Sequence, residues 1–366
     1  MKQLRPRSYK LLFVFRQLVK SMIIFLGIIT LSIIFIGSVG YFISGPKYKG
    51  PVSDHFDGSR FLNPGGIKAN GLREVLKWMI TRKQGEWNEI SEHRDNGKPA
   101  ARVDNGIRVT FINHSTFLIQ VDGVNIITDP VYSKRTSPVQ WAGPRRMRPP
   151  GIKIEDLPKI DVLLLSHNHW DHLDISTVKK MYTTHHPKII TPLGVKAFLD
   201  QEGVTGTDDV DWWQEVKINA SLKIQSVPAQ HFSGRGTFDR DATLWCGYVI
   251  HRPGGNIYFV GDTGYNDKTF NEIGARCSPI QVALIPIGAY KPEWFMAPIH
   301  CTPEEAVKIH REVKSKNSIA MHFGTFPLAD DSQKEPILDL EKALKESGIE
   351  ANTFLVLKEG IPKDFP

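Results

Sequence analysis

The sequence is poor in cysteine, and this scarcity excludes two ways of building a fold. Only three cysteines occur among the 366 residues, at Cys246, Cys277 and Cys301. An odd number of cysteines without paired spacing indicates neither a disulfide framework nor a zinc finger, so we expect three structural thiols. Disorder is not expected either, because 41% hydrophobic and 23% charged residues are typical of a packed globular protein.

Acidic residues are absent from the first twenty positions. This stretch contains six basic residues, namely Lys2, Arg5, Arg7, Lys10, Arg16 and Lys20. Six of the net +7 charges of the chain therefore lie here, and the remainder has a net charge of only +1. Proteins that bind a nucleic-acid backbone cluster Lys and Arg on one face. A nearly neutral remainder argues against this, and no nucleic-acid partner is expected.

Charged residues of either sign are absent from the 22 residues at positions 22–43. A run of this length is able to cross a hydrocarbon core of about 30 Å as a helix. A cleaved signal peptide is the alternative, but the run exceeds the usual apolar region of about 7 to 15 residues and no small-x-small cleavage site follows. The preceding positive charges predict a single-pass protein with a cytoplasmic N-terminus and an extracytoplasmic catalytic domain.

Four segments follow from these patterns: a basic segment at 1–21, a transmembrane helix at 22–43, a tether at 44–62 and one large domain at 63–366. Within the large domain, apolar residues recur at helical spacing over residues 71–83 and predict an amphipathic helix. Its basic residues are compatible with an anionic membrane surface, but packing against the core is favoured. From residue 107 onward, short β-rich runs alternate with helical stretches, which predicts a mixed α/β sandwich.

The strongest chemical signal is the heptapeptide Ser-His-Asn-His-Trp-Asp-His at residues 166–172. It places four ligand-type side chains, His167, His169, Asp171 and His172, between an apolar strand and a helix. Alternate residues of an extended segment point to the same side, while a turn into the helix brings Asp171 and His172 towards a second point. One metal cannot readily use all four side chains. Imidazole and carboxylate donors suit two divalent ions, zinc first, with Mn²⁺ or Fe²⁺ also compatible.

Three further candidates, His231, Asp262 and His322, each follow a β-rich run. A lone histidine at such a place is more often a hydrogen-bonded core residue, but seven candidates in this order favour a metal centre. Asp129 precedes Pro130 at the end of another run, where it either orients a metal-bound imidazole or forms a turn. The pair His185 and His186 is expected to be exposed.

The order His-x-His-x-Asp-His, then His, Asp and His, resembles the ligand pattern of the metallo-β-lactamase superfamily. Segments including FINHSTFLIQVDGVNIITDP, LLSHNHWDHLD, FVGDTGY and WFMAPIHCTPEEAVKIH resemble the N-acylphosphatidylethanolamine-hydrolysing phospholipase D family and its bacterial relatives, from about residue 60 to residue 359. The resemblance implies an αβ/βα sandwich. It also implies one ion held by His167, His169 and His231 and a second held by Asp171, His172 and His322.

In this resemblance Asp262 bridges the two ions, Asp171 and Asp262 belong to the catalytic machinery, and a metal-bridging hydroxide is the nucleophile. His300 would lie in the substrate pocket, where it donates to phosphate or protonates the leaving oxygen. His114 is a tentative member of the surrounding shell. The residue before it is Asn113, whereas the family usually has glycine there, and this departure leaves the role of His114 open.

The implied reaction is cleavage of N-acylphosphatidylethanolamine to phosphatidic acid and N-acylethanolamine, with a membrane phospholipid as substrate. A lactonase or a sugar-phosphate hydrolase is the alternative enzyme, because the same metal cage serves several electrophiles. A non-catalytic membrane-associated binding or envelope factor is the alternative of another class. It is disfavoured because structural zinc sites are closed and usually rich in cysteine.

Overall fold

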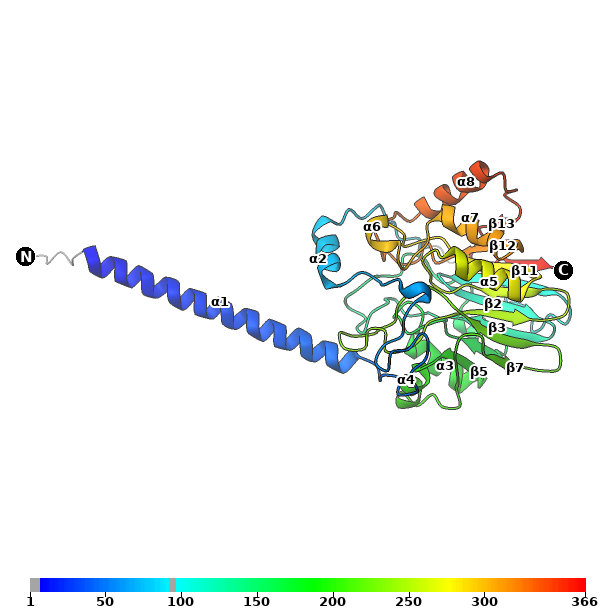
Figure 1. The fold of residues 1–366 in the computed structure, drawn as a ribbon, viewed down its shortest axis with the longest axis horizontal. Coiled ribbons are helices and arrows are strands. Elements are labelled where there is room, and N and C mark those ends of the chain that lie inside the picture. Colours follow the sequence, from blue (N-terminus) through cyan, green and yellow to red (C-terminus); the bar gives the residue numbers. More distant parts are fainter. Residues whose placement is uncertain (1–6, 92–96) are drawn as a thin grey trace, which may run out of the picture. The chain divides into compact units, whose positions relative to one another are not determined.

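The computed structural model describes residues 7–91 and 97–366, so the basic residues Lys2 and Arg5 lie outside the described part. The N-terminal helix α1 (Arg7–Ile43) begins before the predicted start at residue 22. Its portion Leu11–Ile43 is long and apolar enough to cross a membrane, and its most apolar window is not buried. A signal sequence near an N-terminus has the same properties. The helix is a candidate transmembrane span (Figure 1).

The chain separates into two compact units, and the larger one, here called the body, comprises Gly45–Arg235 and Asp239–Pro366. Its core is a pair of seven-stranded sheets. The first has the order β14-β1-β2-β3-β4-β5-β6 and consists of β1 (Ile107–Asn113), β2 (Thr116–Val121), β3 (Val124–Thr128), β4 (Val162–Leu164), β5 (Lys188–Pro192), β6 (Asp208–Val210) and β14 (Pro362–Phe365). The second has the order β13-β12-β11-β10-β9-β8-β7 and consists of β7 (Glu215–Lys217), β8 (Lys223–Val227), β9 (Gly247–His251), β10 (Asn256–Phe259), β11 (Ile280–Pro286), β12 (Ser315–Met321) and β13 (Phe354–Leu355).

The sheets pack face to face through apolar side chains such as Phe111 and Ile119 from one and Tyr248 and Ile285 from the other. Helices cover the outer faces (Figure 1). On the first sheet these are α3 (Ile175–His185) and α4 (Val195–Gln201). On the second they are α5 (Asp267–Cys277), α7 (Pro303–Glu312) and α8 (Glu335–Ser347). The predicted αβ/βα sandwich is confirmed.

The pairing direction within each sheet decides where the site lies. Strands β3 to β6 run parallel to one another, as do β10 to β13. Parallel strands end at the same edge of a sheet, and ligand sites in such sheets form outside those carboxyl ends. Short connections with the helical turns η1 (Pro64–Gly66), η2 (Ile154–Asp156) and α6 (Glu293–Met296) complete the body.

The amphipathic helix is present as α2 (Leu72–Thr81), but its predicted packing against the core is wrong for most of its apolar face. None of its residues is buried, and Leu72, Leu76, Met79 and Ile80 are 51–84% exposed. Of its apolar residues, Val75 and Trp78 pack on the body, in a small cluster around Phe295. The physical reason is that α2 lies against the four-residue α6 rather than a sheet, so little apolar surface is available to cover it.

The expectation that His185 and His186 are both exposed is confirmed for His186 and wrong for His185. His185 ends α3 and is buried, and its Nδ1 accepts a hydrogen bond from the Ile160 amide at 3.3 Å. His186 is exposed in the left-handed conformation that terminates the helix. The period of the helix, and not the polarity of the local sequence, turns the first ring inward. The three cysteines are free and buried, as expected of structural thiols.

Candidate metal centre

The loop of residues 166–173, here called the metal loop, follows β4 and leads into α3. Its turn is fixed by two amide donors, His172 and Leu173, which both bond to the His169 carbonyl at 3.1 and 2.8 Å. Asp174 then caps α3 by accepting a hydrogen bond from the Thr177 amide. This turn separates the loop's ligand-type side chains into two groups, as the sequence pattern predicts.

The first group consists of His167, His169 and His231, whose ring nitrogens lie within 4.8 Å of one another. His167 Nε2 is 2.8 Å from His169 Nδ1, and His231 Nε2 is 3.3 Å from the same atom. His231 arrives from the segment after β8, and its Nδ1 donates to the Ile299 carbonyl at 2.8 Å. Because a carbonyl only accepts, this bond leaves the Nε2 lone pair facing the group.

Burial keeps the first group uncharged. It lowers the pKa of His167 and His231 well below the ordinary value and that of His169 to about 4. Desolvation disfavours the charged form of an imidazole, and neighbouring positive charges, such as that of His172 beside His167 and His169, lower the pKa further. Neutral imidazoles with converging lone pairs are the form of histidine that binds a transition metal.

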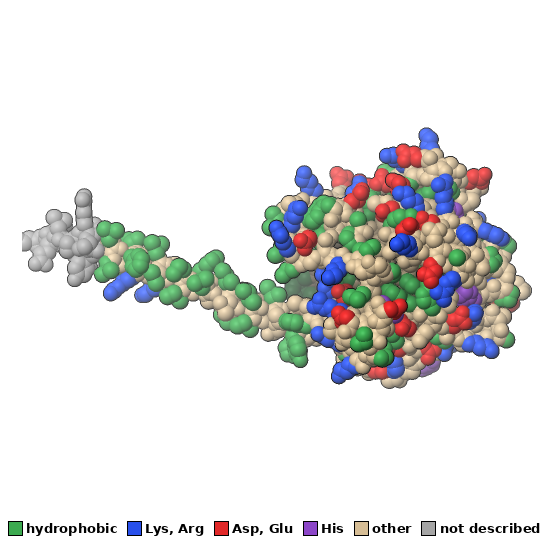
Figure 2. All heavy atoms as spheres, in the orientation of Figure 1, with side chains coloured by type: hydrophobic (Ala, Val, Ile, Leu, Met, Phe, Trp, Pro, Cys, Tyr) green, Lys and Arg blue, Asp and Glu red, His purple; other side chains and the backbone are tan. Residues whose placement is uncertain are grey.

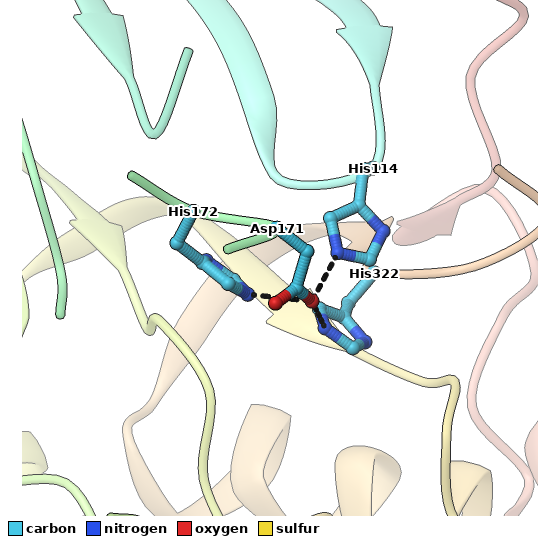
Figure 3. A group of neighbouring side chains, drawn as sticks. All are labelled: His114, Asp171, His172 and His322. Carbon is cyan, nitrogen blue, oxygen red and sulfur yellow. Dashed lines mark hydrogen bonds and ion pairs between the residues drawn. The ribbon is translucent and has the colours of Figure 1, made fainter. Parts of the chain in front are cut away.

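The second group consists of Asp171, His172 and His322, with His114 beside them (Figure 3). Asp171 Oδ2 lies 3.4 Å from both His172 Nε2 and His322 Nε2 and 3.0 Å from His114 Nε2. Burial lowers the pKa of His322, but the Asp262 and Asp171 carboxylates outweigh it and raise the pKa to about 9. Burial opposes ionisation of Asp171, yet His172 and His114 hold its pKa well below the usual range.

Asp262 follows β10 and lies between the two groups. Its Oδ2 is 3.0 Å from His322 Nε2, 3.1 Å from His172 Nε2 and 3.7 Å from His231 Nε2. Its Oδ1 is buried and has no hydrogen-bond partner within the described residues. A buried ionised carboxylate with an unpaired oxygen is costly unless a cation binds it. With five imidazoles and two carboxylates converging here, the donor set fits divalent metal ions.

Asp129 is placed to orient one of these rings. Its Oδ2 accepts from His172 Nδ1 at 2.7 Å and from Ser166 Oγ at 2.6 Å, and its Oδ1 accepts from the Ser166 amide at 2.7 Å. The carboxylate is fully buried at the end of β3. A carboxylate on the far nitrogen of an imidazole fixes its tautomer and its direction. This geometry supports the orienting role of Asp129 over a turn-forming role alone.

His114 also contacts the second group, through both its side chain and its backbone. In addition to the Asp171 contact, its carbonyl accepts from the His322 amide at 2.8 Å, and its own amide donates to Thr325 Oγ1 at 3.1 Å. It occupies the left-handed region at φ 48°. His114 therefore connects two members of the group, although no sequence spacing relates it to either.

His300 lies in the loop between α6 and α7, at the edge of a cavity of about 290 Å³. Its Nδ1 is 4.0 Å from Asp262 Oδ2 and has no hydrogen-bond partner within the described residues. Burial lowers the pKa of His300 to about 4. The polar side chains that line this cavity are His169, Asp171, His231, Asp262 and His300, together with Asn70 and Arg240. The rest of the lining is apolar: Ala69, Val75, Trp78, Phe232, Phe295, Met296, Ile299 and Leu328.

Sequence reasoning missed Arg235, whose side chain donates hydrogen bonds to the backbone of the metal loop. Its Nη1 donates to the carbonyls of Asn168 and Leu173, both at 2.9 Å, and its guanidinium carbon lies 3.7 Å from the Trp170 ring centroid. The Trp170 Nε1 in turn donates to the Arg235 carbonyl at 2.9 Å. No sequence motif indicates a role for Arg235. Its position four residues after His231 was the only available signal.

Comparisons with known proteins show which family and fold the chain is similar to. A family profile described as "Beta-lactamase superfamily domain" matches residues 124–323. The chain is 36% identical to "N-acyl-phosphatidylethanolamine-hydrolyzing phospholipase D 1" of Caenorhabditis elegans over 78% of this chain and 87% of that protein. It is 33% identical to the mitochondrial "N-acyl-phosphatidylethanolamine-hydrolyzing phospholipase D" of Saccharomyces cerevisiae, over 65% of this chain and 52% of that protein. Igni18, a metallo hydrolase from Ignicoccus hospitalis, shares the fold with a TM-score of 0.54 and 23% identity, covering 72% of this chain and 99% of that one.

Proposed function

Because the chain belongs to the metallo-β-lactamase superfamily and is a metal-dependent hydrolase of that fold, we propose that it hydrolyses the phosphodiester of N-acylphosphatidylethanolamine. Water adds across the bond between phosphorus and the ethanolamine oxygen. Phosphatidic acid keeps the new P–O bond, and the ethanolamine oxygen leaves with a proton as N-acylethanolamine. The observation that carries the proposal is a cavity lined both by the ligand cluster and by eight apolar residues, which suits a substrate that carries a charged phosphodiester and apolar chains.

The seven clustered side chains are the proposed metal ligands. His167, His169 and His231 would hold one ion, and Asp171, His172 and His322 the other, with Asp262 shared between them; zinc suits this donor set best. Two bound divalent ions supply a nucleophile from water at neutral pH and neutralise the phosphate oxygens. The two carboxylates, Asp171 and Asp262, offset the positive charge of the site in the absence of substrate.

His300 is the proposed substrate-contacting residue outside the ligand set. Its unpaired Nδ1 borders the cavity that His169, Asp171 and Asp262 also line. We propose that this imidazole donates to a phosphate oxygen or protonates the leaving ethanolamine oxygen. Outside the ligand cluster and His300, Asn70 and Arg240 are the polar side chains of the cavity lining, and the other eight lining residues are apolar.

The apolar helix α1 supports a location at a membrane, where the substrate is. We propose a single span with the basic N-terminus in the cytoplasm and the body on the opposite side, because Lys and Arg are retained on the cytoplasmic side of a span. Protease protection of a tag after Pro366 tests this arrangement in sealed vesicles. Cleavage of the tag only after the cytoplasmic side is exposed would reverse the topology.

The reaction is tested by incubating the metal-loaded full chain with mixed phospholipids that include N-acylphosphatidylethanolamine and identifying the products by mass spectrometry. We expect phosphatidic acid and N-acylethanolamine in equal amounts. D262N should lose both metal and turnover, whereas D209N, which changes a largely buried carboxylate of β6 remote from the cluster, should retain both. Turnover of lactones or sugar phosphates alone would favour the alternative enzymes, and full metal content without any turnover would favour a binding factor.

A further inference from the structure

The outer face of α2 is an apolar surface that the body leaves uncovered. Leu72, Leu76, Met79 and Ile80 are exposed there, Ile80 by 84%. Trp294 of α6 adds a ring that is 45% exposed, and α2 and α6 are in contact. We call these five residues the α2 surface. A cluster of large apolar side chains on one exposed helix normally marks an interaction site.

Basic residues surround the α2 surface. Residues 67–83 contain Lys68, Arg73, Lys77, Arg82 and Lys83, all exposed, and a single acid, Glu74. Lys77 Nζ lies 4.4 Å from the ring centroid of Trp294, so the charge is held beside the apolar patch; Glu293 is the acid next to this ring. Figure 2 shows the same mixture of apolar and basic side chains over α2. A helix with this composition is typical of one that lies in the plane of an anionic membrane interface.

The helix is held so that its apolar face cannot turn inward. Asp330 Oδ1 accepts from Trp78 Nε1 and Arg82 Nε, both at 3.1 Å, and Asp330 Oδ2 accepts from the Lys83 amide at 3.2 Å. Trp78 stacks on Phe295 with ring centroids 5.1 Å apart. The inner side of α2, with Val75 and Trp78, is also a wall of the cavity that contains the metal-ligand cluster.

We propose that the α2 surface docks the body on an anionic lipid bilayer. Apolar side chains of this face would enter the boundary between headgroups and acyl chains, and the surrounding Lys and Arg would contact lipid phosphates. A second copy of the chain is a poorer occupant, because residues 67–83 carry a net positive charge even with Arg82 paired to Asp330, and a symmetric contact would bring two such segments together. Since Val75 and Trp78 line the cavity from the other side of the same helix, a docked bilayer would lie one helix away from the metal-ligand cluster.

The proposal does not depend on the reaction and is tested without measuring turnover. The three native cysteines are buried, so a cysteine introduced at Ile80 takes up an environment-sensitive fluorophore selectively. L338C on α8, where Leu338 is 60% exposed, is the matched control. The labelled full chain is reconstituted into phosphatidylcholine vesicles with and without added phosphatidylglycerol.

In vesicles containing phosphatidylglycerol we expect the I80C probe to shift its emission to shorter wavelength and to be quenched by lipids with spin-labelled acyl chains, while the L338C probe stays exposed to water. R73E/K77E in the I80C background should reduce both effects. A probe at position 80 as exposed to water as the control overturns the proposal. So does a probe already shielded in detergent without lipid, which would indicate a protein contact, or one whose quenching is unchanged by the charge reversal.

Discussion

At the scale of single residues, the contact between Asp129 and His172 decides how well the second ligand group is ordered. The carboxylate is fully buried and bonds to both His172 Nδ1 and Ser166. An amide at this position keeps the shape but loses the charge and presents a donor on one side. We expect D129N to weaken metal binding by about 10- to 100-fold, as measured by competition with a chromogenic chelator.

D209N is the control for this change, because Asp209 is also largely buried and accepts from the Gly194 amide at 2.9 Å without contact to the cluster. Wild-type metal affinity in D129N would indicate that Asp129 only forms the turn.

For His300 we expect loss of turnover without loss of metal. H300A should keep metal content and melting temperature near wild type while reducing turnover of the lipid at least about tenfold, since a positioned proton donor contributes on the order of a hundredfold.

A substrate with a better leaving group separates the two roles of His300. Such a substrate should be less affected by H300A if the ring protonates the leaving oxygen, and equally affected if it binds phosphate. Undiminished turnover of N-acylphosphatidylethanolamine in H300A would leave this residue without a function in the reaction.

The candidate ligands were predictable because chemistry restricts which residue types can hold a metal, and the His-x-His-x-Asp-His spacing is dense. Their supporting residues were not. His114 approaches Asp171 from β1, a separation of 57 residues, and its environment follows from how β1 and β12 end near each other. Arg235 is recognised as a support only when the carbonyls of Asn168 and Leu173 are seen to face it. Backbone acceptors leave no signature in a sequence.

At the scale of elements, the Asp330 carboxylate bonds to α2 and the residues after it at three points. Asp330 accepts from Trp78, Arg82 and the Lys83 amide, and hydrogen bonds to charged groups contribute about 1.5 to 3 kcal/mol. D330A should therefore speed amide exchange over residues 72–81 roughly tenfold or more, as hydrogen–deuterium exchange with mass spectrometry will show. D364A, which breaks the surface pair with Arg108 on β1, should leave α2 unchanged.

The segment before α2 has a pH-sensitive attachment at His55. Its Nε2 lies 2.7 Å from Asp211 Oδ1, and the ring stacks on Trp212 at 4.4 Å. Burial lowers the pKa of His55, but Asp211 and Asp54 outweigh it and raise the pKa above the ordinary value. A raised folded-state pKa stabilises the protein fully below the unfolded value near 6.5, and this stabilisation disappears as pH rises through the folded value.

H55Q should consequently lower the melting temperature more at pH 6 than at pH 9. The effect is modest, because a partly exposed pair contributes about 1 kcal/mol or less. Thermal unfolding of both proteins across this pH range measures it. An equal loss at the two pH values would show that the stacking on Trp212, and not the charge of the imidazolium, attaches the segment.

At the scale of the whole molecule, the sandwich was predictable because alternating strands and helices with clear turn signals admit few arrangements. The exposure of α2 was not predictable, since an amphipathic pattern indicates that a helix has an apolar face but does not indicate what covers that face. The two sheets meet through the buried core, whereas α2 rests on four residues of α6. Only the tertiary structure distinguishes these two situations.

The proposed metal content also predicts the stability of the body. Ions that bind only the folded chain stabilise it, by about 4 kcal/mol when the free metal is a thousandfold above its dissociation constant. Removing the metal with a chelator should lower the melting temperature by several degrees, and zinc should restore it. D262N should respond little to either treatment, and a wild-type melting temperature indifferent to chelation would contradict a bound metal pair.

The three buried thiols determine how the folded chain responds to reducing and oxidising compartments. Burial raises the pKa of Cys246 to about 12 and that of Cys277 to about 11, so neither offers the thiolate through which disulfides form and exchange. Cys301 is equally enclosed, with its Sγ 3.3 Å from the Pro286 carbonyl. The folded body thus offers no reactive thiol to thiol oxidoreductases, and we expect the same three free thiols on the reducing and the oxidising side of a membrane.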